Sequence, residues 1–272
     1  MGWQWYARDT GEYFMDRSAH EVISLPPPPR LRAADIALFL DVDGTLLEIE
    51  REPGAVHVPD RLCRILEHLQ GATSGALALV SGRSLEQLDR LFSPLCFSAA
   101  GLHGLERRSL ALGTVRAAQD PKILEKARRR LAAFADLNEG ILLEDKALTL
   151  ALHYRNAPEL AEAAIAVAEQ AVAESAGALV LLHGKMVCEL KPPGIDKGRA
   201  IAAFLEERPF VGRRPVFAGD DLTDEAGFAT INERGGVSVR IGESRPTAAM
   251  FGHRDVAAVQ TWLVELLKDE AA

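Results

Sequence analysis

Short apolar runs alternate along this chain with longer segments in which apolar residues recur at the spacing of a helix face. Residues 36–40 form an uninterrupted apolar run, which is typical of a strand buried on both faces of a sheet. Residues 61–69 follow with apolar side chains three and four positions apart, as in an amphipathic helix. Residues 76–80 are strand-like again, and Ser84 and Gln87 have the pattern of a capping box that opens another helix. Strand–helix–strand repeats of this kind predict a parallel sheet with helices on both faces.

The middle of the chain has a different pattern. Asp120 and Pro121 have the residue types of an N-cap and a first helical residue, and they predict a helix that extends to about Phe134. The other elements expected here are strands at 141–144, 148–154, 178–183 and 186–190 and a helix at 158–175. Short connections between adjacent strands indicate antiparallel pairing. We therefore predict a smaller α/β domain with an antiparallel sheet, inserted at about residues 118–190.

The alternating pattern resumes after Pro192-Pro193-Gly194. The elements expected there are helices at 197–206, 222–231 and 256–267 and strands at 215–218 and 237–241. A split core at residues 35–117 and 191–272 therefore flanks the insertion. Residues 1–34, which contain several aromatic residues and four consecutive prolines, are expected to form an irregular N-terminal extension. This extension either packs on the body of the protein or binds a partner.

Composition excludes several classes of protein. The chain has 272 residues, of which 48% are hydrophobic and 26% charged, as in ordinary globular domains. Its formal net charge of −8 argues against nucleic acid as a partner, because phosphate backbones require a basic surface. The sequence has no apolar run long enough to span a membrane and no secretory signal, so a cytoplasmic protein is expected. The three cysteines lack metal-ligand spacing and are expected to be free thiols.

Two carboxylates follow directly on the first apolar strand, in the segment Asp41-Val42-Asp43-Gly44-Thr45. In a parallel sheet the ligand site lies at the carboxyl ends of the strands. Asp41 and Asp43 are therefore candidates for binding a metal ion and for chemistry on a substrate. An acidic turn that only caps a helix is the alternative.

A second acidic cluster occupies positions 219–225, again just after a short apolar strand. It contains Asp220, Asp221 and Asp224. Carboxylates placed so closely repel one another unless a cation compensates their charge, and hard oxygen ligands of this type favour Mg²⁺. A solvated helix start would explain one or two of these residues, but it would not explain the matching cluster at Asp41. We therefore expect a Mg²⁺ site between the two clusters.

Two further elements are suited to the anionic part of a substrate. Ser81-Gly82-Arg83 follows the strand at 76–80 and precedes a helix, where backbone amides and a hydroxyl form an anion site. Lys197 begins another expected helix and could offset the charge of a phosphoryl group. Each feature is weak by itself, but the four in this order are strong joint evidence for a functional site.

The four elements resemble the ordered motifs of the haloacid dehalogenase-like (HAD) phosphohydrolases. The second aspartate of the first motif, Asp43, indicates phosphoryl transfer because the dehalogenases of that group lack it. Three more segments narrow the match, namely residues 99–106 (AAGLHGLE), 152–155 (LHYR) and 183–192 (HGKMVCELKP). Together with the GDDLTDE segment at 219–225 they resemble the trehalose-6-phosphate phosphatase family. The similarity extends from about residue 35 to 265.

The resemblance implies a Rossmann-like HAD core with a parallel sheet and a smaller inserted α/β cap domain with an antiparallel sheet. It also implies that Asp41 is the nucleophile that forms an aspartyl-phosphate, and that Asp43 is the general acid and base. Ser81 and Lys197 would bind the phosphoryl oxygens and complete the expected catalytic set. The implied ligands of Mg²⁺ and of its bound waters are Asp41, the backbone carbonyl of Asp43, Asp220, and Asp221 or Asp224.

The inserted domain is expected to close over the sugar. By resemblance, substrate contacts come from charged side chains of this domain, namely Glu144, Lys146, Arg155, Lys185 and Glu189. Lys185 and Glu189 are four residues apart in an expected strand and therefore lie on the same side of it. The other expected substrate-binding residues, from the core, are Gly82, Arg83 and His103. For any one cap residue, an ordinary charged sheet surface is the alternative.

The expected activity is therefore Mg²⁺-dependent hydrolysis of trehalose 6-phosphate to trehalose and phosphate, a phosphoric monoester hydrolase reaction of trehalose biosynthesis. A phosphatase for another sugar phosphate and a catalytically inactive sugar-phosphate sensor are the alternatives. The sensor is disfavoured because Asp41, Asp43, Lys197 and Asp220 are all present, and a phosphomutase because the cap residues match the hydrolase. The sequence does not determine whether a trehalose-phosphate synthase is a partner.

Overall fold

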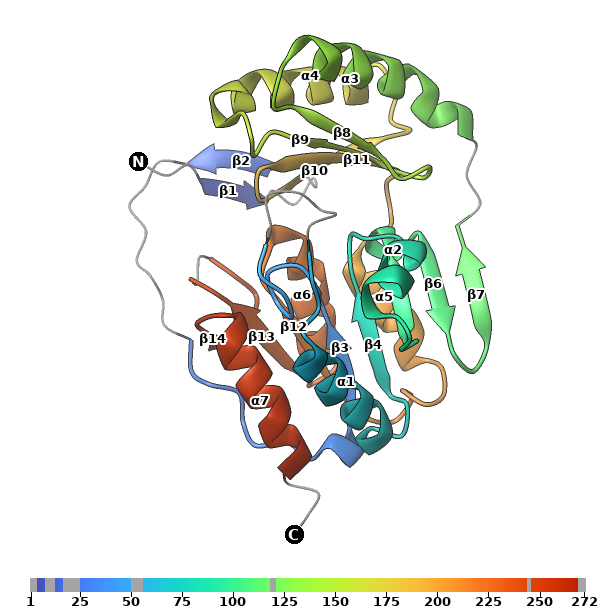
Figure 1. Ribbon diagram of the computed structural model, residues 1–272, viewed down its shortest axis with the longest axis vertical. Coiled ribbons are helices and arrows are strands. Elements are labelled where there is room, and N and C mark those ends of the chain that lie inside the picture. Colours follow the sequence, from blue (N-terminus) through green and yellow to red (C-terminus); the bar gives the residue numbers. More distant parts are fainter. Residues whose placement is uncertain are drawn as a thin grey trace.

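The chain folds into a larger unit built on a mostly parallel sheet and a smaller unit built on an antiparallel sheet (Figure 1). The computed structural model describes residues 4–7, 13–16, 25–49, 56–117, 121–243 and 246–268. The predicted fold class, an α/β core with a parallel sheet and a second antiparallel sheet, is confirmed. Within the described part of the chain, no helix combines the length and the apolar character that crossing a bilayer requires.

The larger sheet has eight strands in the order β14-β13-β12-β3-β4-β5-β6-β7. Its strands are β3 (Ile36–Leu40), β4 (Leu77–Val80), β5 (Ser98–Gly101), β6 (Glu106–Ser109), β7 (Gly113–Arg116), β12 (Arg214–Gly219), β13 (Val237–Ile241) and β14 (Phe251–His253). Strands β14 to β5 pair in parallel, whereas β6 and β7 continue the sheet in antiparallel pairing. Every residue of β3 is buried, as expected of a strand covered on both faces.

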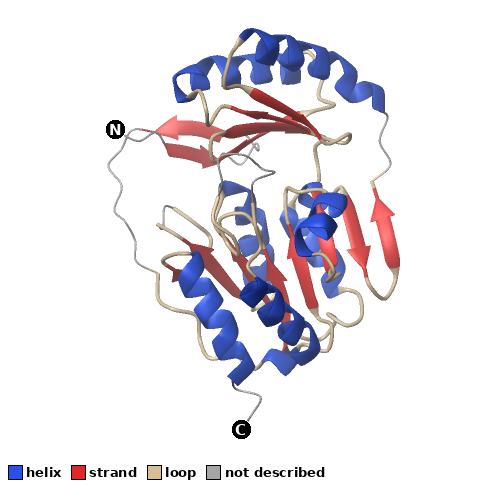
Figure 2. Cartoon of the chain, in the orientation of Figure 1, coloured by secondary structure: helices blue, strands red, loops and turns tan. Residues whose placement is uncertain are grey.

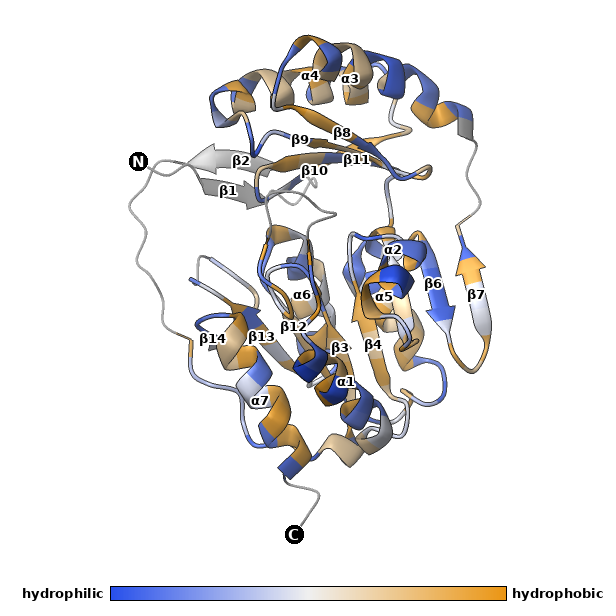
Figure 3. Ribbon diagram, in the orientation of Figure 1, coloured by the Kyte–Doolittle hydropathy of each residue, from blue (hydrophilic) through white to orange (hydrophobic). Residues whose placement is uncertain are grey.

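Helices cover both faces of this sheet. They are α1 (Asp60–Ala72), α2 (Leu85–Phe92), α5 (Lys197–Leu205), α6 (Glu225–Glu233) and α7 (Val256–Lys268). Helix α1 contacts α7, and α5 contacts α6. Leu38 of β3 lies in one apolar cluster with Leu62 and Leu263. The next residue, Phe39, lies in a second cluster beside Phe204, with 6.0 Å between ring centroids. Alternate residues of the central strand thus serve the two faces, and apolar residues dominate the middle of the core (Figure 3).

The smaller unit, which we call the cap, comprises the described residues 121–191. Its strands β8 (Leu142–Asp145), β9 (Leu150–His153), β10 (Val180–Gly184) and β11 (Val187–Lys191) form an antiparallel sheet in the order β10-β11-β9-β8. Helices α3 (Glu125–Leu137) and α4 (Ala161–Ala173) pack on one face of this sheet, where Leu131, Leu152 and Ala168 belong to one apolar cluster. The other face of the sheet is turned towards the core (Figure 2).

Helix starts agree with the capping signals. In the predicted capping box of α2, the Ser84 hydroxyl accepts a hydrogen bond from the Gln87 amide at 3.1 Å. The Gln87 side-chain oxygen in turn accepts one from the Ser84 amide at 2.8 Å. The expected N-cap Asp120 lies outside the described residues. From Pro121 the chain forms a 3-10 turn to Leu124 before α3 begins.

Several short strands differ from the sequence-based expectation. Residues Gln4–Ala7 (β1) and Tyr13–Asp16 (β2) form an antiparallel pair, so the prediction of an irregular N-terminal extension was wrong for these residues. Both segments contain aromatic residues, which favour strands. Strand β5 was not anticipated because its sequence, Ser-Ala-Ala-Gly, lacks β-branched residues, and pairing with β4 places it in the sheet. The carbonyl of Pro26, in the proline run, accepts a hydrogen bond from the Gly252 amide of β14 at 2.9 Å.

Close packing of α5 on α6 leads to a first prediction. A Cβ atom built on Gly198 would lie 2.4 Å from the Ala226 carbonyl oxygen, so the helices would have to separate. We expect Gly198→Ala to lower the free energy of unfolding by about 1–3 kcal/mol. Gly71→Ala in α1 is the matched control, because a Cβ there meets nothing within 4 Å, and it should raise that free energy by about 0.5–1 kcal/mol. Urea unfolding measures both values, and equal stability of Gly198→Ala and wild type would contradict the prediction.

Candidate active site

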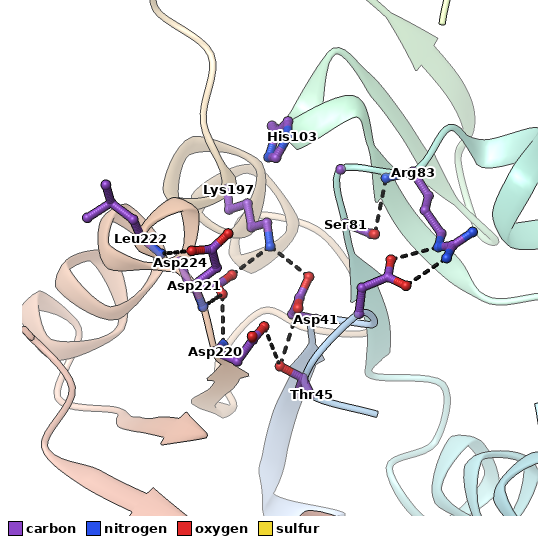
Figure 4. A network of polar contacts seen from close by, with 12 residues as sticks. Asp41, Thr45, Ser81, Arg83, His103, Lys197, Asp220, Asp221, Leu222 and Asp224 are labelled. Atoms are coloured by element: carbon purple, nitrogen blue, oxygen red, sulfur yellow. Dashed lines mark hydrogen bonds and ion pairs between the residues drawn. The ribbon is translucent and has the colours of Figure 1, made fainter. Parts of the chain in front are cut away.

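The two acidic motifs meet at the carboxyl ends of β3 and β12. These strands pair in parallel with Leu40 opposite Ala218, and the Asp41 amide donates to the Ala218 carbonyl at 3.0 Å. Asp41 follows β3 and Asp220 follows β12, so their carboxylates lie in one cluster (Figure 4). Gly44 has a φ of +88°, and a Cβ there would lie 2.1 Å from a carboxylate oxygen of Asp220. Only glycine therefore allows this turn to pass so close to the second motif.

Asp41 is 4% exposed and bonded through both carboxylate oxygens. The Lys197 amino group donates to one of them at 2.7 Å, and the Thr45 hydroxyl donates to the other at 3.3 Å. Burial raises the pKa of Asp41 well above its usual value, although the charge of Lys197 opposes this rise. The neighbouring charges of Asp224 and Asp220 raise this pKa further. A cation that offsets these carboxylates would therefore favour the ionised form of Asp41.

Lys197 is the first residue of α5, and the side chain of Asp196 caps that helix by accepting from the Arg199 amide at 2.8 Å. Its amino group lies between Asp41 and Asp224, at 2.6 Å from the latter. Burial by itself would lower the pKa of Lys197, but the charges of Asp224 and Asp41 outweigh burial and raise it. Lys197 is therefore a permanent buried cation beside Asp41.

Among the described residues, Asp41, Asp220 and Asp224 each offer one carboxylate oxygen, and these three atoms lie within 4.8 Å of one another. Burial and the charge of Asp224 raise the pKa of Asp220 to about 6. Buried carboxylate oxygens in this arrangement fit a small divalent cation such as Mg²⁺. Asp221 lies outside the group, since its side chain accepts a hydrogen bond from the Leu222 amide at 2.7 Å, at the start of a 3-10 turn.

Asp43 is turned away from this carboxylate group and bound by Arg83. The Arg83 guanidinium donates to both carboxylate oxygens of Asp43, at 2.7 and 2.6 Å. A bidentate pair of this kind is among the stronger charge-assisted contacts in proteins. The structure therefore places Arg83, expected to bind substrate, on the aspartate expected to transfer protons.

The loop after β4 carries the predicted anion-binding residues. The buried Ser81 hydroxyl accepts a hydrogen bond from the Arg83 amide at 3.2 Å, and the Ser81 carbonyl accepts one from the His103 amide at 3.0 Å. A Cβ on Gly82 would lie 2.8 Å from Nε2 of His103. His103 itself has a φ of +57°, which is uncommon for residues other than glycine. The absence of a side chain at Gly82 and the turn at His103 thus allow the two loops to approach closely.

Glu189 of β11 joins the cap to the core. One of its carboxylate oxygens lies 3.0 Å from Nε2 of His103, and the other accepts a hydrogen bond from the Thr149 hydroxyl at 2.6 Å. Burial alone would raise the pKa of Glu189, but the charge of Lys146 and the contact with His103 outweigh it and lower the pKa. Glu189 is therefore ionised in a buried position between the two units.

Two lysines of the cap also contact the core. The Lys146 amino group donates to the Gly82 carbonyl at 3.0 Å. The Lys185 amino group forms an ion pair with Asp220, and its backbone carbonyl accepts a hydrogen bond from Arg155 at 2.8 Å. Lys146 thus contacts the core at the loop after β4, and Lys185 contacts it at the second acidic motif.

The cavity that contains the candidate site lies between the cap and the core, with about 990 Å³ of empty space that includes some open solvent. The predicted site residues that line it are Asp41, Asp43, Ser81, Gly82, Arg83, His103, Glu144, Lys146, Arg155, Lys185, Glu189, Lys197, Asp220 and Asp221. Asp224 does not line the cavity. It is fully buried beside Lys197, and one of its oxygens accepts hydrogen bonds from the Asp220 and Asp221 amides, both at 2.9 Å.

Sequence reasoning missed residues that support the predicted ones. Thr45 and Thr149 bind Asp41 and Glu189 respectively, whereas Gln87 and His153 both contact Glu144 and line the cavity. The capping-box pattern identified Gln87 only as a helix-start residue. Nothing in the sequence indicated that its side chain also reaches the cap.

Comparison with known proteins agrees with this geometry. A family model described as trehalose-phosphatase matches residues 39–257. A probable trehalose-phosphate phosphatase of Sinorhizobium fredii is 45% identical over 79% of this chain and 81% of its own. The trehalose-6-phosphate phosphatase of Escherichia coli is 44% identical over 85% of this chain and 86% of its own. The C-terminal domain of a Candida albicans trehalose-6-phosphate phosphatase shares the fold with a TM-score of 0.79, at 22% identity over 90% of this chain and 99% of that domain.

Proposed function

Because the chain belongs to the trehalose-phosphatase family, we propose that it is a Mg²⁺-dependent phosphatase that hydrolyses trehalose 6-phosphate to trehalose and phosphate through an aspartyl-phosphate at Asp41. The observation that supports this most directly is the position of Asp41. Its carboxylate lies at the end of β3, bonded to a buried lysine, in a cavity that the charged cap residues also line.

In the first step, a carboxylate oxygen of Asp41 attacks the phosphorus atom, and the bond between phosphorus and the sugar oxygen breaks. Asp43 donates a proton to that oxygen, which leaves as the hydroxyl group of trehalose. The Arg83 guanidinium occupies both carboxylate oxygens of Asp43, so proton donation by Asp43 requires Arg83 to exchange this contact for an anionic group of the substrate.

In the second step, Asp43 accepts a proton from a water molecule that attacks phosphorus. The bond from phosphorus to Asp41 breaks, phosphate leaves, and the free carboxylate is restored. Lys197 lies 2.7 Å from an oxygen of Asp41, so its charge is available to the phosphoryl oxygens in both steps. The Ser81 hydroxyl lines the cavity and can donate a further hydrogen bond to that group.

Asp41 and Asp220 are the residues that would hold Mg²⁺, with Asp224 close enough to complete the set. When bound, Mg²⁺ would offset the negative charge of the carboxylates and of the phosphoryl group. The Lys185 amino group contacts Asp220, so it is placed to exchange that carboxylate for a substrate oxygen. Lys185 thereby connects the cap to the carboxylates of the core.

Sugar specificity is assigned to the cap because its side chains combine donors and acceptors. Glu144 and Glu189 accept hydrogen bonds, and Lys146, Arg155 and Lys185 donate them, which suits the hydroxyl groups of a disaccharide. The cap supplies these two glutamates and three basic residues to the lining of the cavity, so we assign the phosphate to residues of the core. The alcohol and the phosphate are therefore expected to bind to different units of the protein.

Phosphate release from trehalose 6-phosphate tests the proposal. We expect steady hydrolysis with millimolar Mg²⁺ and a loss of at least about 100-fold when a chelator removes the metal. Added Mg²⁺ should restore the rate. Asp220→Asn should raise the Mg²⁺ concentration needed for half-maximal rate by about tenfold or more, because it removes one anionic ligand.

Asp136→Asn is the matched control, since it makes the same chemical change at an exposed position of α3. It should leave the Mg²⁺ requirement at the wild-type value. Full activity in the presence of chelator would rule out the metal-dependent mechanism. Hydrolysis of other sugar phosphates with no hydrolysis of trehalose 6-phosphate would rule out the proposed substrate.

A further inference from the structure

The carboxylate of Glu144, in strand β8 of the cap, is held from two sides. The Gln87 side-chain amide, which belongs to the core, donates to one oxygen of Glu144 at 2.7 Å. Nε2 of His153, on the neighbouring strand β9 of the cap, lies 3.0 Å from the other oxygen. Both carboxylate oxygens of Glu144 therefore have a defined partner, and one of these partners belongs to the other unit of the protein.

The side-chain oxygen and the side-chain nitrogen of Gln87 each make a different contact. Its oxygen accepts from the Ser84 amide at 2.8 Å and so closes the capping box of α2. Its nitrogen is thereby directed away from the helix, towards Glu144. The capping box consequently fixes the direction in which Gln87 can donate to the cap.

The surroundings of Glu144 place this contact in the substrate cavity. Gln87, Glu144 and His153 all line the cavity beside Arg83 and Lys146. The Glu144 side chain is only 19% exposed, and the Lys146 amino group lies 3.9 Å from it. Burial would raise the pKa of Glu144, but the contacts with His153, Lys146 and Gln87 lower it to about 2. Glu144 is therefore an ionised acceptor whose two carboxylate oxygens face Gln87 and His153.

We propose that Gln87 is a positioning residue for sugar recognition, which orients the Glu144 carboxylate towards the sugar hydroxyls when the cap lies against the core. The inference rests on the proposed function, because it assigns Glu144 to the sugar. Gln87 stands on the core, so Glu144 has its full set of partners only in the closed arrangement. Recognition of the sugar is thus completed at the moment when the cap contacts the loops that hold the phosphate.

The alternative is a purely structural role, in which Gln87 only stabilises the start of α2. Three variants separate the two roles. Gln87→Glu keeps the capping box, because Glu is equally suited to its third helical position, but it sets a carboxylate against Glu144. Ser84→Ala weakens the capping box and leaves the Gln87 amide free to donate to Glu144. Gln87→Met removes both contacts at nearly constant side-chain size.

The measurements are KM and kcat for trehalose 6-phosphate, the inhibition constant of inorganic phosphate, and Tm. We expect Gln87→Glu and Gln87→Met to lower kcat/KM by about 10- to 100-fold, mainly through KM, since Glu144 loses a donor or gains a repulsive neighbour. Inhibition by phosphate, which carries no sugar, should stay within about twofold of wild type. Ser84→Ala should keep wild-type kinetics and lower Tm by about 2–4 °C, and Gln87→Met should show a comparable loss of Tm.

Other outcomes overturn the proposal. Equal kinetic losses in Ser84→Ala and Gln87→Glu would assign the effect to the helix start. A matching loss of phosphate inhibition in Gln87→Glu would assign it to the reacting centre, and wild-type KM in both Gln87 variants would remove the role altogether. A wild-type protein that does not hydrolyse trehalose 6-phosphate would instead reject the proposed function, so the two failures are distinct.

Discussion

Asp41→Asn is expected to lower kcat for phosphate release by about 10⁴-fold or more, to the limit of detection, because an amide cannot form the phosphorylated intermediate. The substitution keeps the size and shape of the side chain, so the neighbouring Thr45 and Lys197 keep a polar partner. Phosphate release from trehalose 6-phosphate with saturating Mg²⁺ measures the effect. Residual activity within tenfold of wild type would contradict a covalent role for Asp41.

The same variant has an expected stability that separates lost chemistry from lost folding. The pKa of Asp41 is raised in the folded protein by burial and by its acidic neighbours, so the ionised form costs stability. That cost is absent at low pH, where the carboxyl is protonated, and appears as the pH rises through the folded pKa. A neutral amide avoids it, so metal-free Asp41→Asn should have a Tm at pH 7 equal to or above that of wild type. A much lower Tm would show that the amide disrupts the site instead.

Lys197→Met is expected to lower both stability and activity. It would leave the buried carboxylates of Asp41 and Asp224 without their shared cation, which costs about 3–5 kcal/mol of unfolding free energy. It would also remove the cation nearest to the reacting oxygen, and we expect kcat to fall by about 10³-fold. Chemical denaturation without Mg²⁺ and phosphate release with Mg²⁺ measure the two effects.

Two controls support the interpretation of Lys197→Met. Lys126→Met on α3 removes a lysine that is 65% exposed and pairs with Glu174, so it should change unfolding free energy by less than about 1 kcal/mol. The double variant Lys197→Met with Asp224→Asn removes a cation and an anion together, and it should be less destabilised than the sum of the single variants. Strict additivity would show that Lys197 and Asp224 do not stabilise one another.

The core could be predicted because its signals are local. The apolar run of β3 is buried on both faces, and the carboxylates that follow it lie where parallel strands place a ligand. The antiparallel strands β6 and β7 carry few apolar residues. Strand β6 belongs to the sheet through pairing with β5, and β7 through pairing with β6. These strands form because a neighbouring strand pairs with them, and the sequence pattern of a single segment does not reveal such pairing.

The sequence predicted which residues form the candidate site, but not which of their side chains contact one another. The order of the motifs indicated that Asp41, Lys197 and Asp220 act together. Asp41 and Asp220 each follow a strand of the parallel sheet, and Lys197 begins a helix. Arg83 on Asp43 and Gln87 on Glu144 could not be foreseen, because these contacts depend on side-chain direction and on how the cap rests on the core. The sequence therefore predicted which residues gather at the site more completely than it predicted their contacts.

Strand β11 runs directly into the turn that precedes α5, and this continuity has a geometric consequence. Glu189 lies near the end of β11 and Lys197 at the start of α5, with the left-handed Gly194 in the turn between them. One short piece of backbone thus sets the spacing between Glu189, which we propose to bind the sugar, and Lys197, which we propose to bind the phosphate. A sugar that carries its phosphate on another carbon could reach either Glu189 or Lys197, but it could not contact both at the same time. The length of a connecting turn, as well as the chemistry of the side chains, thereby limits which esters fit.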